Sequence, residues 1–334
     1  MSFLLNIFNF RLFDQKNIYF EKPITFITGK NQSGKSSIIE AIYILKTGKS
    51  FRTNSLNNCI KEGQKFFSIE LKDKITEKLI YNEQGIKSYF KNEEKSKNDI
   101  INPEIFILYN RNLFNFIFQT DFRRKTIDEL ISSYDKKYLY YLIHCKKIIE
   151  KKKEIIYSNI DFNTKKNLYF NLVTNFAEYT KYVNSKRMDI INQINQFISK
   201  YSNYNIEYHS KFSDMNVEMI TKFYEKNFPI EIEQNKYLGP HNDFYSLIDN
   251  NKKLIESGAT SDFYKFYFYL FLFFINKVYN EQKIYPIVLF DDFFLPLDLS
   301  SSKKLISYFN DEMTIIISQH ENIQIDKDFG EINL

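Results

Sequence analysis

Cysteine is scarce in this 334-residue sequence, which contains two, Cys59 and Cys145. Two cysteines are too few for a disulfide framework, and their separation matches no zinc-binding spacing. Small disulfide-stapled domains and zinc modules are therefore excluded as classes. Because so little cysteine is typical of a reducing compartment, we expect a cytoplasmic protein.

We also expect no secretory leader and no membrane-spanning segment. Its first residues, MSFLLNIFNFRLF, contain no basic segment followed by an apolar core and a small-residue cleavage site. The most apolar stretch, 263–275, is shorter than the ~20 residues that a membrane-spanning helix needs, and it includes Lys265. We expect a buried helix there and no membrane partner.

Tryptophan is absent, whereas Lys, Asn, Ile, Phe and Tyr are abundant, a bias typical of an AT-rich genome. Lysine runs are therefore weak evidence of function by themselves. The net charge of +5 is unevenly distributed, because residues 111–200 hold 17 Lys and Arg against 9 Asp and Glu, or +8, and the remainder sums to −3. A basic middle segment indicates contact with a polyanion in one part of the molecule.

The pattern of apolar residues predicts an α/β fold interrupted by long helices. Expected strands lie at Ile24–Thr28, 66–71, 104–109, 286–290 and 314–317, with a helix at 300–309. In the middle segment the apolar spacing changes to 4,3, the period of a helical seam. One seam runs from Ile127 to Ile148 and the other from Leu172 to Phe197, after an Asn-rich break at 158–167. We expect two antiparallel helices of about 30 residues, or roughly 45 Å each, forming a short arm.

Residues 29–36 read Gly-Lys-Asn-Gln-Ser-Gly-Lys-Ser, the G-x-x-x-x-G-K-S pattern of a P-loop, between an apolar strand and the helix-like segment SIIEAIYIL. Such a loop surrounds phosphate oxygens with backbone N–H groups and a helix N-terminus. We therefore predict an ATP site in which Lys35 reaches the β- and γ-phosphates and Ser36 ligates Mg²⁺. The predicted binding residues are Gly29, Lys30, Asn31, Gln32, Ser33, Gly34, Lys35, Ser36 and Ser37.

A P-loop ATPase needs a carboxylate on a neighbouring strand, and Asp291-Asp292 ends the apolar run at 287–290. Asp291 is the predicted magnesium ligand. Asp292 stands where a base would deprotonate the attacking water, a role that ABC-type enzymes usually give to Glu. His320 closes the next apolar strand at the position of a γ-phosphate sensor. We expect Lys35, Asp292 and His320 to be the catalytic residues.

Several further motifs occur in one order through nearly the whole chain. They are Asn9-Phe10-Arg11, Glu40-Ala41-Ile42-Tyr43, TGKSFRT at 47–53, Arg123-Arg124 with Asp128, Leu238-Gly239-Pro240-His241, and Asp291-Asp292 with Leu297-Asp298. With the P-loop, they resemble the motifs of RecF, a bacterial recombination-mediator ATPase related to SMC proteins.

This resemblance implies an α/β fold that is an ABC/SMC-type P-loop ATPase head with an inserted helical second lobe. Residues 1–105 and 235–334 are then expected to form the ATP-binding head, and residues 106–234 the helical lobe with its arm. The resemblance also implies a role in recombinational repair and replication restart. It implies ATP-dependent homodimerisation on DNA that is duplex, gapped or at a junction of single and double strands. It also implies cooperation with RecR and RecO in loading recombinase at gaps.

The sequence departs from the family at several positions. Gln32 replaces the middle glycine of the P-loop, Ser36 replaces Thr, and Asn242 and Phe244 replace an Arg and an Asp after Gly-Pro-His. The family's S-x-G-Q-x-R signature corresponds to residues 257–262, SGATSD, where the serine alone is kept. In ABC-type dimers this loop caps the partner's ATP, so we expect Ser257 and Gly258 to act in trans, with a weak dimer and slow hydrolysis.

The basic middle segment supplies candidate contacts to DNA phosphates, which are Arg123, Arg124, Lys146, Lys147, Lys151, Lys152 and Lys153. The same lysines are also explained by a solvated face of the arm. A transport ATPase is disfavoured, because 256 residues separate Lys35 from Asp291. A small-molecule kinase is disfavoured because the Asp pair lies late in the chain. A nucleotide-dependent binding module with little catalysis stays open, since the signature is altered.

Overall fold

The computed structural model describes residues 2–96, 104–320 and 323–334. The chain divides into two compact units, one formed by Met1–Phe114 and Thr260–Leu334 and the other by Asn115–Ala259. The sequence placed the second boundary earlier, at residue 235. The helical unit extends beyond that point because β10 (Phe244–Asp249) pairs with β9 (Tyr204–His209) inside it.

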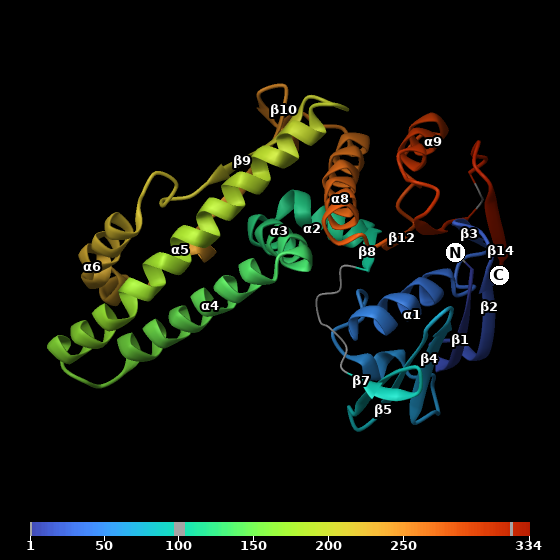
Figure 1. Ribbon diagram of the computed structural model, residues 1–334, viewed down its shortest axis with the longest axis horizontal. Helices are drawn as coiled ribbons and strands as arrows, with labels where there is room; N and C mark the ends of the chain where they lie inside the picture. The colour runs from blue at the N-terminus through green and yellow to red at the C-terminus, as the bar shows by residue number, and fades with distance from the viewer. Residues whose placement is uncertain (1, 97–103, 321–322) are drawn as a thin grey trace. The chain divides into compact units, whose positions relative to one another are not determined.

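The discontinuous unit contains an antiparallel sheet in the order β2-β1-β4-β5-β6-β7 (Figure 1). Its strands are β1 (Phe3–Phe10), β2 (Phe13–Phe20), β4 (Phe66–Lys72), β5 (Thr76–Asn82), β6 (Lys87–Lys91) and β7 (Glu94–Ser96). In β1, the side chains of Phe3, Leu5 and Ile7 are buried and alternate with half-buried ones, as expected for a sheet with one face on the core.

A parallel sheet in the order β14-β3-β13-β12-β8 carries the predicted P-loop strand. Its strands are β3 (Ile24–Thr28), β8 (Ile105–Tyr109), β12 (Ile287–Asp291), β13 (Thr314–Ser318) and β14 (Phe329–Asn333). Every residue of β3 and β13 is buried, and this explains why both sequences read as continuous apolar runs. These strands confirm the predicted α/β class.

The helices of this unit are α1 (Lys35–Thr47), η1 (Leu56–Cys59), α8 (Thr260–Gln282) and α9 (Leu299–Ser307). Helix α1 contacts strands of both sheets, which places it between them, and eleven of its residues are buried. Helix α8 confirms the buried helix predicted at 263–275. Among the helices of the described residues, none combines the length and apolarity needed to cross a membrane. Helix α2 (Asn110–Phe118) spans the division between the units.

The second unit is mainly helical, with α3 (Thr120–Tyr134), α4 (Lys136–Tyr157), α5 (Phe162–Ile198), α6 (Val217–Gln234) and α7 (Leu254–Ser257). Its small sheet has the order β11-β10-β9, with β11 at Lys252–Lys253, and a short 3-10 turn, η2, covers Pro240–Asn242. Helices α4 and α5 lie side by side as an antiparallel hairpin, with α6 along α5 (Figure 1). The predicted helical arm is therefore present.

The prediction of one long helix from Ile127 to Ile148 is wrong, because the chain breaks between α3 and α4 at Asp135. Asp135 has an extended backbone, and its carboxylate accepts a hydrogen bond from the Tyr138 N–H, so it is the N-cap of α4. The 4,3 spacing continues across the break and conceals it. Helix α5 has 37 residues and α4 has 22, so the two arm helices are unequal.

Candidate nucleotide-binding site

The loop from β3 to α1 has the backbone of a phosphate-binding loop. Gly29 and Gly34 have φ angles of 142° and 103°, which favour glycine. A Cβ atom at Gly34 would lie 2.5 Å from a ring carbon of Phe13, and one at Gly29 would lie 2.5 Å from the Leu334 carbonyl oxygen. Both glycines of the motif are therefore required by conformation and by close packing.

Gln32 occupies the position where the resembled family has a glycine, and its φ is 67°. A residue with a Cβ atom costs roughly 1–2 kcal/mol in this left-handed region. The departure therefore adds strain to the loop. Gln32, Lys30 and Asn31 are exposed, and Ser33 and Ser36 are half-buried.

Lys35 begins α1, and its ammonium donates hydrogen bonds to the carbonyl oxygens of Gly29 and Lys30, both at 2.8 Å. The side chain is buried and folded over the loop. The first turn continues with Ser36 and the buried Ser37, whose N–H donates to the Gly34 carbonyl at 2.9 Å. A helix N-terminus with a lysine at its mouth is an anion-binding arrangement.

Strand register places the Asp pair beside this loop. Asp291 pairs with Ser318 across β12 and β13, and Ser318 pairs with Ile27, two residues before Gly29. The Ser318 hydroxyl donates a 2.7 Å hydrogen bond to Asp291 Oδ1, which orients the carboxylate. The sheet is parallel here, so the carboxyl ends of these strands share one edge.

Asp292 has unusual geometry for a non-glycine residue, with a φ of 51°. Its Oδ1 atom is buried and has no hydrogen-bond partner among the described residues. Burial, followed by the charge of Asp291, raises the pKa of Asp292, whereas Lys35 and His320 lower it. The structure thus brings Lys35, Asp291, Asp292 and His320 into one electrostatic neighbourhood.

A cavity of about 1050 Å³ adjoins the P-loop. It is lined by Thr28, Gly29, Lys30, Leu299, His320, Gln324, Glu331, Asn333 and Leu334. The unpartnered buried oxygen of Asp292, the glycine cradle and the lysine at the helix mouth fit a nucleoside triphosphate with Mg²⁺. Ser36 and Asp291 are the residues that would hold the metal, since hydroxyl and carboxylate oxygens are its preferred ligands.

Glu40 is a site-supporting residue whose role the sequence did not reveal. It is fully buried on α1 and accepts two hydrogen bonds from Arg11, at 2.9 Å and 2.7 Å. The Ser50 hydroxyl and Arg52 donate to the same carboxylate, at 2.5 Å and 3.3 Å. A buried glutamate inside the apolar run SIIEAIYIL needs a cationic partner. The presence of a charged residue in this run is the sequence signal that could have predicted the pairing.

The altered signature lies at the C-terminus of α7, in the helical unit. Ser257 Oγ donates to the Lys253 carbonyl at 3.2 Å, and the Gly258 N–H donates to the Leu254 carbonyl at 2.8 Å. Both predicted γ-phosphate donors are therefore engaged within their own turn. Their action on a partner's nucleotide stays a prediction that requires these local bonds to open.

Two of the candidate DNA contacts are corrected by the structure, because both side chains are buried. Arg123 donates to the backbone carbonyls of Phe116, Ile117 and Tyr245, and burial lowers its pKa to about 10. Lys152 pairs with Glu231 at 2.8 Å, and burial lowers its pKa to about 8. These cations are internal partners and not surface contacts. Lys146, Lys147, Lys151 and Lys153 are exposed, and Arg124 is half-buried.

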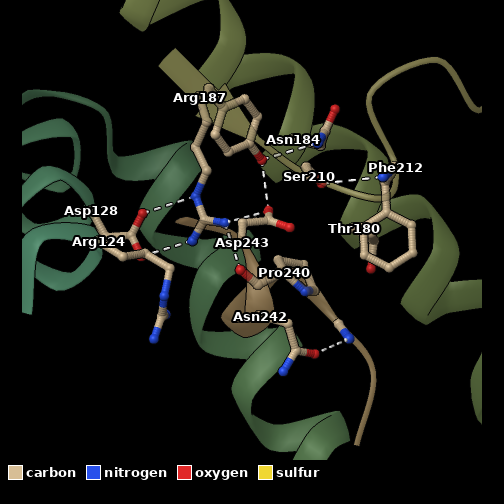
Figure 2. Close-up of polar contacts among 12 residues, drawn as sticks. Arg124, Asp128, Thr180, Asn184, Arg187, Ser210, Phe212, Pro240, Asn242 and Asp243 are labelled. Atoms are coloured by element: carbon tan, nitrogen blue, oxygen red, sulfur yellow. Dashed lines mark hydrogen bonds and ion pairs between the residues drawn. The ribbon is translucent and has the colours of Figure 1, made fainter. Parts of the chain in front are cut away.

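Arg187 is the centre of the polar network inside the helical unit (Figure 2). Its guanidinium pairs with Asp128 at 2.8 Å and 3.0 Å and with Asp243 at 2.8 Å, and it donates to the Pro240 carbonyl at 2.7 Å. The Tyr208 hydroxyl also donates to Asp243, at 2.6 Å. The Arg-Arg-x-x-x-Asp and Gly-Pro-His segments, far apart in sequence, are therefore joined through one buried arginine.

We compared the chain with protein families, curated proteins and solved structures. Residues 4–257 match the model of the AAA domain. This chain belongs to the AAA domain family. Two curated relatives, both named DNA replication and repair protein RecF, match most of it. The protein from Clostridium novyi is 25% identical over 333 residues, which cover 93% of this chain and 91% of that protein. The protein from Clostridium acetobutylicum is 26% identical over 339 residues, covering 92% and 90%.

Solved structures show the same fold. The recombination mediator protein RecF-ATPrS of the RecFOR pathway has a TM-score of 0.80 at 20% identity, covering 99% of this chain and 96% of that one. An Smc head bound to the C-winged helix domain of ScpA has a TM-score of 0.53 at 13% identity, covering 96% and 90%. The predicted resemblance to RecF over nearly the whole chain is confirmed by these relatives, and the fold of an SMC-like head is confirmed by the solved structures.

Proposed function

We propose that this chain is an ATP-dependent DNA-binding protein of recombinational repair and replication restart, with ATPase activity. The observation that carries the proposal is the P-loop, completed across the parallel sheet by Asp291 and Asp292, in a chain related to RecF over more than nine-tenths of its length. The partners proposed for this chain are those that the resemblance predicts, namely gapped or duplex DNA, RecR and RecO. A cytoplasmic location remains a prediction.

Some residues of the site bind the nucleotide, and Asp292 transfers a proton. Lys35 releases the two loop carbonyls and pairs with the β- and γ-phosphates, while the first-turn amides of α1 surround their oxygens. Ser36 and Asp291 would hold Mg²⁺, which would supply positive charge against the phosphate oxygens. Asp292 accepts the proton of the attacking water at its unpartnered Oδ1, because its raised pKa makes the carboxylate a better base. His320 orients the γ-phosphate from the end of β13.

Two copies of the chain are proposed to close around two ATP molecules, with Ser257 and Gly258 of each copy covering the partner's γ-phosphate. Ala259 and Asp262 weaken this contact, because one adds a methyl group in place of glycine and the other adds negative charge beside a polyanion. We expect a weak dimer and slow hydrolysis. A nucleotide-dependent binding module with little catalysis remains the second candidate, favoured by the local engagement of both signature donors.

Asp292→Asn tests the dimer cycle, because it removes the base and retains Asp291 for Mg²⁺. We expect sedimentation with ATP and Mg²⁺ to show a longer-lived dimer for this variant than for the wild-type chain. Lys35→Ala, in which ATP binding is weakened, is the matched control. A variant that stays monomeric at high concentration, with DNA present, contradicts the cycle.

Equilibrium binding to a fluorescent gapped duplex tests the function itself. We expect ATP with Mg²⁺ to tighten binding of the wild-type chain and to have no effect on Lys35→Ala. Equal DNA affinity with and without ATP would mean that the nucleotide site does not control DNA, and absent binding in both states would remove DNA as the partner.

A further inference from the structure

A group of cations surrounds the Gly-Pro-His segment of the helical unit and has no role in the nucleotide site. Arg124 comes from α3, Lys153 from α4 and His241 from η2. The segment is anchored on both sides, because Lys152 donates to the Leu238 carbonyl at 3.2 Å and Arg187 donates to the Pro240 carbonyl at 2.7 Å. Its position relative to α4 and α5 is therefore fixed by buried bonds.

Close packing sets the path of the segment. A Cβ atom at Gly239 would lie 2.8 Å from a ring carbon of Phe176 and 3.1 Å from His241 Nδ1. The Gly239 N–H donates to Asn242 Oδ1 at 3.0 Å, which closes the turn (Figure 2). Glycine is thus needed for the imidazole of His241 to lie against the backbone of the segment.

Polar atoms in this group are left without partners. Arg124 Nε is buried and unpaired among the described residues, as is His241 Nδ1. The Arg124 guanidinium points away from Arg187 (Figure 2), and its ion pair is with Asp121, an 81% exposed carboxylate 3.2 Å away. The Lys153 ammonium lies 5.2 Å from the ring centroid of Tyr237 and is exposed. Lys153 is the exposed member of the group, and Arg124 and His241 are half-buried.

The charges of Arg124, Lys152 and Lys153 all act on the imidazole of His241. Burial, followed by the charges of Arg124, Lys152 and Lys153, lowers the pKa of His241 to about 4. Lys152 is already compensated by Glu231, whereas Arg124 and Lys153 have no buried carboxylate beside them among the described residues. An anion bound between them would relieve this repulsion and favour the imidazolium.

We propose that Arg124, Lys153 and His241 form a binding site for a backbone phosphate of DNA. The inference rests on the proposed DNA-binding function and locates its contact. Arg187 is a positioning residue, since it holds the segment that presents His241. A DNA strand fits better than an acidic peptide, because Lys146 lies two turns from Lys153 on the same face of α4, about 10 Å away, and extends the cationic row for a linear polyanion.

Fluorescence anisotropy with a labelled gapped duplex and ATP tests the site on the full chain. The probe variants are Arg124→Gln and Lys153→Gln, singly and together, and the matched control is Lys226→Gln, an exposed lysine of α6 in the same unit. We expect the double variant to bind about tenfold more weakly and to flatten the dependence of log affinity on log salt by roughly 0.9 per lost contact. The control and Arg124→Lys retain wild-type binding, and thermal unfolding checks that each variant is folded.

A second readout separates phosphate contact from a structural role. The His241 proton resonance, assigned with His241→Gln, is expected to show a pKa raised from about 4 when the duplex is added. If the double variant has the DNA affinity and the salt slope of the wild type, the proposed phosphate site is wrong. The proposed function would then still stand. If the double variant loses binding to labelled poly-glutamate and keeps its DNA affinity, the ligand of these cations is an acidic protein and not DNA. A wild-type chain that binds ATP and no DNA overturns both proposals.

Discussion

Replacing Arg187 with methionine removes a guanidinium that pairs with two buried carboxylates. Arg187 is fully buried, and the side chains of Asp128 and Asp243 are 7% and 2% exposed. Burial opposes the charged form of Arg187, yet Asp128 and the surrounding tyrosines raise its pKa well above the ordinary value. Removing one partner of a buried ion pair costs about 3–5 kcal/mol, because the remaining charge has no compensation. We expect a loss of this size in the stability of the helical unit at pH 7.

The loss has a defined pH dependence. In wild type, burial already raises the pKa of Asp243 and Arg187 opposes that rise. Without the arginine, burial raises the pKa of Asp243 further above its unfolded value, so the folded variant binds more protons than the unfolded chain. The destabilisation is therefore largest above the raised pKa of Asp243, and it diminishes as the pH falls through that pKa.

Hydrogen–deuterium exchange of peptides from α5 is the appropriate measurement, since it reports the helical unit separately in a chain that is not expected to unfold in one step. The control is Arg187→Met combined with Asp128→Asn and Asp243→Asn, which removes the uncompensated charges and recovers most of the loss. A single variant with α5 protection within 1 kcal/mol of wild type at pH 7, or with a loss independent of pH, refutes the reasoning.

Three further outcomes follow from the same contacts. Lys35→Ala removes a charge-assisted contact worth roughly 1.5–3 kcal/mol to the phosphates, so calorimetry is expected to show ATP affinity reduced by that amount with the fold intact. Glu231→Leu leaves the Lys152 ammonium buried and destabilises the helical unit by about 3–5 kcal/mol, and adding Lys152→Met recovers part of this in the hydrogen-exchange protection of α4. His241 has a folded pKa of about 4, below its unfolded value, so stability falls as pH decreases from about 6.5 to 4, by roughly 3 kcal/mol in total, and His241→Gln abolishes that dependence.

Much of the nucleotide-binding unit was predictable because its signals are local. The spacing of the P-loop glycines predicts the backbone conformation of the loop. Strands β3, β12 and β13 are apolar runs in the sequence because parallel strands are buried on both faces. The antiparallel sheet gave weaker signals, since its pairing depends on contacts between residues 1–20 and 66–96 that no local pattern encodes.

The errors concern charged residues inside helices. Lys152 was read as a surface cation, yet it lies four residues from the buried Ile148 and Ile156 and therefore on the buried face of α4. Arg123 has the same relation to Ile127. Helical spacing could have shown that both side chains are buried. Their partners could not be predicted, because Glu231 and the Tyr245 carbonyl come from distant segments.

Steady-state ATP hydrolysis, measured with and without a gapped duplex, tests most directly whether the nucleotide site and DNA are coupled in this chain. We expect slow turnover that increases when the duplex is added, and that is lost in Lys35→Ala and Asp292→Asn. Turnover that is identical with and without DNA, over concentrations where DNA is bound, would contradict the account.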